Sequence, residues 1–279
     1  MNELLVAVFD SEDMALKGMR TLMDLHQEGG VSLYASALIV KGGDGNISVK
    51  QQSGEPPLGT ALGLLIGGIV GLVGGPVGSA VGASLGGYIG LLADWAHTGI
   101  ELKFLDDVGK TLSAGKAAIL AEIEESWISL LEPRLREQGG IVFRRFRTDV
   151  VEDQLLQESK ALQERLEALI NDLDKANSDI GRANVADKEA LQKSIRDARQ
   201  QLETVGDKAK AAMDLKKAEN DLKVSVLLRQ AESAAEHARI RIKKRIADTE
   251  EDFEMRSNKL TQARALAKKF TLPPIYQNS

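Results

Sequence analysis

One stretch of the chain carries residue types that bind phosphate in other proteins. The segment VGKTLSAGKAA, at residues 108–118, contains two glycines, two lysines and a threonine, as phosphate-binding loops do. The spacing differs, because Gly109 and Gly115 enclose five residues rather than four and Ala117 stands where a serine or threonine would hold magnesium. The segment also precedes a predicted strand instead of a helix. We therefore expect no nucleotide site here.

The histidines and acids show no spacing typical of a metal centre. His26, His97 and His237 lie far apart, and the nearest arrangement, Glu232 with Glu236 and His237, lacks the Glu-x-x-His spacing that places two ligands on one helical face. The chain has no cysteine, which excludes disulfides, thiolate metal sites and thiol nucleophiles. We expect no metal, no cofactor and no enzymatic activity.

Two basic clusters could contact an anionic surface, either lipid headgroups or nucleic-acid phosphate. Their members are Arg144, Arg145 and Arg147 in the first cluster, and Arg239, Arg241, Lys243, Lys244 and Arg245 in the second. A net charge of -5 argues against nucleic acid as a partner. Acidic residues follow the second cluster from Asp248 to Asp252, so a solvated face and charge pairing between helices are alternative interpretations.

The segment GTALGLLIGGIVGLVGGPVGSAVGASLGG, at residues 59–87, repeats glycine at every fourth position, and residues 56–93 contain no charged side chain. The repeated glycines are Gly59, Gly63, Gly67, Gly71 and Gly75, followed by Gly78, Gly82, Gly86 and Gly90. Gly74, Gly75 and Pro76 interrupt the pattern and predict a hinge between two helices. We call this arrangement a glycine-zipper hairpin.

Glycine at this spacing allows two helix backbones to approach closely, which works best in lipid or in the core of an oligomer. Each half of the hairpin has about 17 residues and a helical length of about 26 Å, slightly less than the about 30 Å of a bilayer's hydrocarbon core. Tyr88 and Trp95 are placed as interfacial aromatic residues would be. A membrane hairpin, a plug inside a soluble oligomer and a flexible loop remain the three interpretations.

Strands and helices alternate on both sides of this segment. Apolar runs predict strands at 3–9, 31–40 and 117–123, with a shorter strand in ISVKQQ and a last one in IVFRRFR. Helices are expected after Asp10 and Ser11, around residues 102–113, and in SWISLLEPRLREQ. Two successive strand–helix–strand units suggest an α+β fold with a ferredoxin-like split βαβ domain.

The remainder of the chain predicts long helices. Leu155, Leu162 and Leu169 lie seven residues apart, as in a coiled coil. The pattern weakens near Gly181 and near Gly206, and the sequence does not decide at which of the two the helices turn.

The order of an LLVAVFD strand, a helix, a second strand, an uncharged GxxxG hairpin and a half ending in GGIVFRRF resembles an uncharacterised bacterial and archaeal family. Its members are commonly labelled as membrane proteins, and they are similar to this chain over residues 1–150. The resemblance implies no reaction, cofactor or catalytic residue. It does not cover the helical extension.

The predicted division gives a ferredoxin-like domain at 1–55 and 99–148, the hairpin at 56–98, a coiled coil at 149–270 and an extended tail at 271–279. We expect a non-enzymatic, self-assembling, membrane-associated scaffold whose partners are itself and a lipid bilayer. A protein partner for the coiled coil or tail is a further expectation.

The expected location is the cytoplasmic side of the inner membrane, with the cytoplasm as the alternative. A soluble homo-oligomeric shell or ring with buried hairpins, and a ligand- or stress-sensing module, are the alternative functions.

Overall fold

The computed structural model describes residues 2–54, 60–73, 102–125, 130–146, 151–178 and 185–269. Its contacts group into two compact units. The first consists of Met1–Asp149 and Ala218–Glu250, and the second of Val150–Lys217 and Glu251–Ser279. This grouping differs from the predicted division, since residues 218–250 belong with the sheet rather than with the coiled coil.

The first unit is built on a five-stranded antiparallel sheet in the order β3-β2-β4-β1-β5. The strands are β1 (Asn2–Phe9), β2 (Val31–Lys41), β3 (Ile47–Ser53), β4 (Ala117–Glu125) and β5 (Ile141–Phe146). Each strand lies where an apolar or alternating run predicted one. The prediction of an α+β fold is confirmed.

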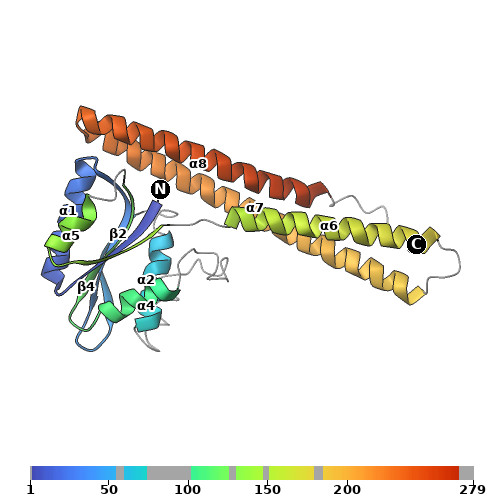
Figure 1. Ribbon diagram of the computed structural model, residues 1–279, viewed down its shortest axis with the longest axis horizontal. Coiled ribbons are helices and arrows are strands. Elements are labelled where there is room, and N and C mark those ends of the chain that lie inside the picture. The colour runs from blue at the N-terminus through green and yellow to red at the C-terminus, as the bar shows by residue number, and fades with distance from the viewer. Residues whose placement is uncertain are drawn as a thin grey trace. The chain divides into compact units, whose positions relative to one another are not determined.

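Helices cover both faces of the sheet (Figure 1). On one face lie α1 (Glu12–Gln27) and α5 (Leu131–Glu137), and on the other α2 (Thr60–Val73) and α4 (Leu102–Thr111). Helix α1 begins as expected, because the Ser11 hydroxyl accepts a hydrogen bond from the Met14 N–H at 3.3 Å. The alternation of side chains along central strands β1 and β4 supplies a separate apolar layer to each face.

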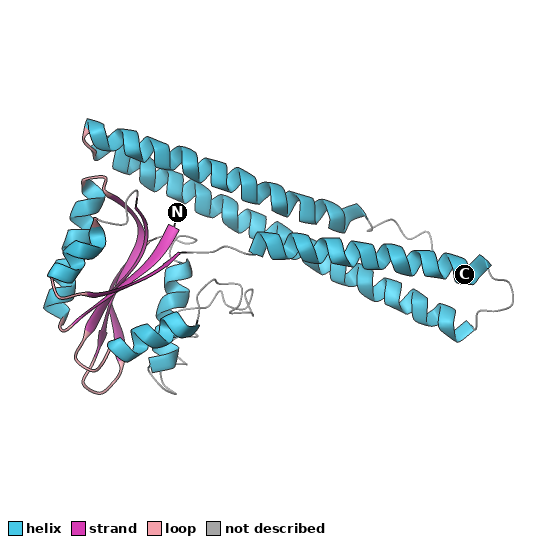
Figure 2. Cartoon of the chain, viewed as in Figure 1, coloured by secondary structure: helices cyan, strands magenta, loops and turns pink. Residues whose placement is uncertain are grey.

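The first unit also contains two antiparallel helical segments from the C-terminal part of the chain. Helix α7 (Val185–Ser233) ends and α8 (Glu236–Lys269) begins within a few residues, so the chain reverses direction there (Figure 2). We call residues 218–250 the helical hairpin. Its apolar side chains form a buried cluster with Tyr34 of β2, consisting of Leu227, Ala234, Ala238 and Ile242.

The second unit is a three-helix core. It contains α6 (Val151–Ser178), residues 185–217 of α7 and residues 251–269 of α8. The leucines of the predicted heptads lie in this core. Leu155, for example, packs with Val205 and Leu260.

The helices do not turn near Gly206, because α7 runs through that residue. A Cβ at Gly206 would lie 2.7 Å from the Cβ of Ala267, so this glycine allows α7 and α8 to approach closely. The breaks lie instead between Ser178 and Val185 and between Ser233 and Glu236, and the second was not predicted.

Several predicted features lie outside the described residues. They are Gly59, the hinge at Gly74, Gly75 and Pro76, the second glycine stripe at Gly78, Gly82, Gly86 and Gly90, Tyr88, Trp95, Arg147, Gly181, and the tail at 271–279.

Candidate functional site

Helix α2 packs one apolar face on the sheet. Leu62, Leu65, Ile66, Ile69 and Val70 recur at the spacing of one helical face, and all are at most 3% exposed. They share a cluster with side chains of β1, β2, β4 and α4. The first half of the predicted hairpin is therefore part of the core of the first unit.

The glycines of α2 lie at the edge of this face and beyond it, since Gly63 is seven residues from the packed Val70. Gly63 and Gly67 each follow a sheet-packed residue by one position, so they are rotated from it by about 100° around the helix. Both are half-buried, and a Cβ at Gly63 would meet no atom within 4 Å in the part of the chain that the structure describes. A side chain at Gly63 would therefore have space beside the packed face of α2.

Helix α2 has 14 residues and no charged side chain. Among the residues that the structure describes, no helix has both the length and the apolar character required to cross a membrane.

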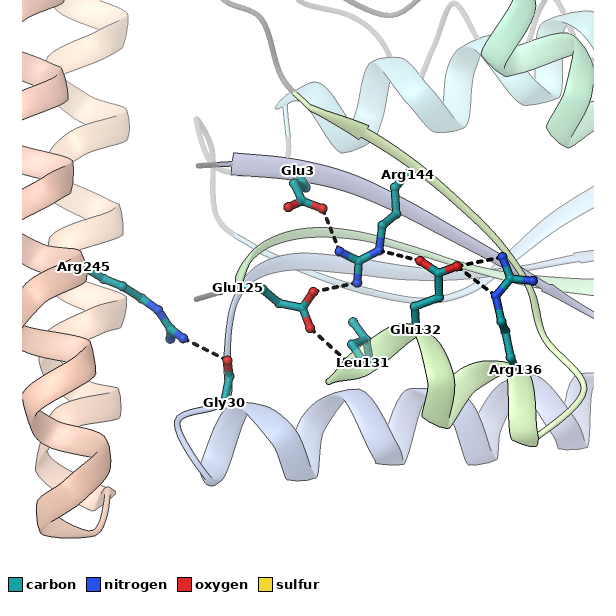
Figure 3. A network of polar contacts seen from close by, with 8 residues as sticks. All are labelled: Glu3, Gly30, Glu125, Leu131, Glu132, Arg136, Arg144 and Arg245. Carbon is teal, nitrogen blue, oxygen red and sulfur yellow. Dashed lines mark hydrogen bonds and ion pairs between the residues drawn. The ribbon is translucent and has the colours of Figure 1, made fainter. Parts of the chain in front are cut away.

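A buried ion cluster surrounds Arg144 on the face of the sheet that carries α1 and α5 (Figure 3). Its guanidinium contacts Glu3 at 2.9 Å, Glu125 at 2.6 Å and Glu132 at 3.3 Å. Arg136 holds the same Glu132 at 2.7 Å. The sequence placed Arg144 in a surface cluster, but its side chain is only 12% exposed. Arg144 pairs with carboxylates of its own domain, so the predicted contact with an anionic surface is wrong for this residue.

The cluster has structural consequences for Glu3. Burial raises the pKa of Glu3, while the Arg144 guanidinium opposes this shift and the nearby Glu125 carboxylate reinforces it. The Glu125 carboxylate also accepts the Leu131 N–H at 3.1 Å, at the start of α5. The ion cluster thus joins β1, β4, β5 and α5 at one end of the sheet.

A second polar cluster joins the helical hairpin to β2. Arg245 donates to the Gly30 carbonyl at 2.8 Å and to the Ser32 hydroxyl at 2.7 Å. Gln230 accepts from Ser32 and donates to the carbonyls of His26 and Val31. Arg245 and Gln230 are each 3% exposed. The predicted anionic-surface role is therefore wrong for Arg245 as well.

Close backbone approach accompanies these hydrogen bonds. Gly29 ends α1 with a positive φ of 71°, and a Cβ there would lie 2.8 Å from the Cβ of Ala238 in α8. Glycine is required at position 29 for two reasons: its backbone has a positive φ, and α8 occupies the space that a side chain would need.

A third group of buried contacts joins the α7 segment of the helical hairpin to the sheet. Tyr34 donates to Glu124 at 2.6 Å, and the Lys223 ammonium lies 5.6 Å from the centre of the Tyr34 ring. Lys223 also pairs with Glu219 at 2.6 Å and lies 3.9 Å from Glu122. Burial, together with Glu124, raises the pKa of Tyr34 well above its ordinary value. These groups hold the hairpin to the sheet rather than forming an open site.

The other basic residues have varied surroundings. Arg145 is half-buried, Arg239 pairs with Glu236 at 3.3 Å, and Arg241 donates to the His237 carbonyl at 3.4 Å. Lys243 and Lys244 are exposed, and neither makes an ion pair with a described residue. The described members of the two predicted basic clusters therefore differ in burial and in partners.

The side chains that the sequence suggested for phosphate or metal binding have other surroundings in the structure. In the phosphate-loop-like segment, Lys110 pairs with Asp106 of its own helix and Lys116 with Asp10 at 2.9 Å. Within the described ranges, no group of three histidine, aspartate or glutamate side chains is placed to hold a metal ion.

The sequence did not predict which residues bind the helical hairpin to the sheet. Gln230 and Lys223 resemble ordinary polar positions of a long helix, and Arg245 was expected to contact an anionic surface. The sequence does not reveal their partners, which lie about 100 to 215 positions away. One signal was available: the alanine-rich stretch from Ala231 to Ala238 indicates a close packing partner.

Comparison with known proteins gives one partial match. No curated protein and no solved structure matches the chain. The expected similarity to an uncharacterised family is confirmed in part. It was expected over residues 1–150, whereas the match begins at residue 59 and extends into α6, and the expected membrane character is not confirmed. A domain of the family described as "Protein of unknown function (DUF1269)" is found at residues 59–167.

Proposed function

We propose that the chain is a non-enzymatic scaffold that associates with copies of itself through the glycine-rich segment at 56–98. The observation that carries this proposal is the division of α2 into two faces. Its leucine and isoleucine face packs on the sheet, whereas Gly63 and Gly67 lie at the edge of that face and beyond it. A helix that is apolar all round is normally covered on every side, and among the described elements the sheet and α4 cover part of α2.

Close packing of two helices would explain the glycines energetically. Each glycine in a helix costs about 1 kcal/mol relative to alanine, so a stripe of them needs a compensating contact. Backbone-to-backbone approach between two such stripes supplies dispersion contacts and weak Cα–H···O contacts. The same segment of a second copy presents a stripe with the same spacing.

The packing of α2 favours an oligomer core over a bilayer as the place where these stripes meet. If α2 entered lipid, Leu62 and Ile66 would leave the sheet and expose Leu4, Val6 and Leu120, which are now at most 1% exposed. Burial of apolar area stabilises by about 25 cal/mol per Å², so this exposure opposes insertion.

Membrane association is the second candidate. It is favoured by the uncharged sequence from 56 to 93, and it would place the scaffold on the cytoplasmic side of the inner membrane.

We also propose that the sheet is ferredoxin-like. The order β2-β4-β1-β5, with α1 and α5 on one face, supports this assignment, and β3 would then be an added edge strand. A ligand-sensing role is the third candidate, favoured by a hollow of about 420 Å³ lined by residues that include His26, Leu33, Arg229 and Gln230.

Fractionation of the full-length chain tests the proposal. The expected result is a single large particle that stays in the supernatant without detergent and keeps its mass when detergent is added. A chain that pellets with membranes and needs detergent for release would support the second candidate. A monomer in both conditions would contradict self-association.

A further inference from the structure

Helix α8 has a second long face opposite the one that it buries. Its buried residues include Ala238, Ile242, Arg245, Leu260, Ala263 and Ala267. On the other side, Ile240 and Met255 are 67% and 55% exposed. Ala247 lies between them on the same face and is also exposed.

The basic and acidic residues of this outer face lie in separate halves of it. Lys243 and Lys244 precede Ala247, whereas Glu251 and Glu254 follow it. All four side chains are exposed, and none forms an ion pair with another residue that the structure describes. The spacings of three and four residues keep them on the same side of the helix as Ile240 and Met255.

A helix with this pattern is complementary to itself in the antiparallel direction. A two-fold axis near Ala247 would place Lys244 of one copy opposite Glu251 of the second and Lys243 opposite Glu254. The same axis would place Ile240 opposite Met255 at both ends of the contact. The small side chain of Ala247 at the centre would let the two helices approach closely.

We infer that the outer face of α8, defined by Ile240, Lys243, Lys244, Ala247, Glu251, Glu254 and Met255, pairs antiparallel with the same face of a second copy. The inference rests on the proposed self-association for its partner, but it uses a surface separate from the glycine stripe. Charge complementarity along the whole face points to a second copy, since an anionic lipid surface would repel the acidic half.

Charge reversal tests this pairing, because the two halves can be exchanged between chains. The variant Lys243→Glu/Lys244→Glu has an acidic face throughout, and Glu251→Lys/Glu254→Lys has a basic one. Two-fold symmetry repeats each ion pair, so either variant alone would place four like-charge pairs across the contact. We expect each to weaken pairing at least about tenfold.

An equimolar mixture of the two variants is the decisive sample. We expect it to pair at least as tightly as the wild type, through a one-to-one complex of unlike chains, since all pairs then have opposite charge. Fluorescence energy transfer between separately labelled chains measures this directly. The control variant Lys208→Glu/Lys210→Glu changes exposed charges on α7 and should leave the signal unchanged.

The outcomes separate this inference from the proposed function. If the wild type associates and neither charge-reversed variant changes the signal, the α8 contact is wrong while self-association stands. A wild type that stays monomeric contradicts both. If the Lys→Glu variant keeps its pairing and loses only binding to phosphatidylglycerol vesicles, the basic half serves lipid and the inference is overturned.

Discussion

Arg245 of α8 donates to the carbonyl of Gly30 at 2.8 Å across 215 positions of the chain, and both residues are part of the same compact unit. This hydrogen bond connects the first third of α8 to the residue that precedes β2. It shows that the α+β domain is completed by residues that the sequence assigned to a coiled coil.

Replacing Arg245 with alanine should destabilise this unit by about 2–4 kcal/mol, because the Gly30 carbonyl and the Ser32 hydroxyl lose a charged donor in a buried site. Chemical denaturation followed by circular dichroism measures the change. Arg229→Ala is the matched control, since Arg229 is exposed on the same hairpin, and it should stay within about 0.5 kcal/mol of the wild type. Equal effects of the two variants would contradict the assignment.

Replacing Arg144 with methionine should cost about 3–5 kcal/mol at pH 7, because the Glu3 and Glu125 carboxylates would lose their cation while staying buried. The penalty should shrink as the pH falls, since burial raises the pKa of Glu3 and its protonation removes an uncompensated charge. Arg136→Met changes a side chain that is 57% exposed and should cost less than about 1 kcal/mol. A penalty for Arg144→Met that is independent of pH would show that the loss is one of packing alone.

His26 should make the first unit less stable below neutral pH. Burial and the nearby Arg245 lower the pKa of His26, although a hydrogen bond to Val31 opposes the shift. Folding therefore favours neutral His26, so its contribution is present above the ordinary pKa of 6.5 and lost as the pH falls through the lower folded value. The His26 side chain also accepts the Leu33 N–H at 3.2 Å through Nδ1, which protonation would prevent.

Proton NMR should show His26 titrating below pH 6.5 in the folded chain. Substitution by glutamine, whose side-chain oxygen can accept the same N–H, should remove this part of the pH dependence of unfolding. An unchanged pH profile in His26→Gln would assign the loss of stability at low pH to a group other than His26. Glu3 is not that group, because its raised pKa acts with the opposite sign.

Gly206→Ala should destabilise the second unit, although alanine is the better helix former by about 1 kcal/mol. The new Cβ would lie 2.7 Å from that of Ala267, and relieving this overlap should cost about 1–3 kcal/mol. The double variant Gly206→Ala/Ala267→Gly should recover most of the loss relative to the sum of its single variants. Additive effects would mean that the two helices do not meet at these residues.

Local patterns predicted the elements of the sheet well. The apolar runs that became β1, β2 and β4 each lie between turn residues, and Ser11 caps α1 as its type and position suggest. These features depend on neighbours within a few residues, which a single sequence contains.

Long-range partners were not predictable in the same way. Arg144 and Arg245 belong to runs of basic residues that are typical of a surface, yet each is buried because distant carboxylates or carbonyls meet its guanidinium. Gly206 indicates a helix break when its neighbours alone are considered, and a close helix contact once Ala267 is known. The side on which α2 packs likewise depends on the sheet beneath it.

The mass of the full-length particle in Gly63→Leu/Gly67→Leu tests the central claim most directly. A Cβ at Gly63 would meet no atom of the described residues within 4 Å, so a larger side chain there should leave their packing intact while blocking a second helix. Sedimentation or light scattering should show a defined oligomer for the wild type and a clear loss of mass for the variant, with unchanged circular dichroism. A variant that keeps the wild-type mass would contradict assembly through the glycine stripe.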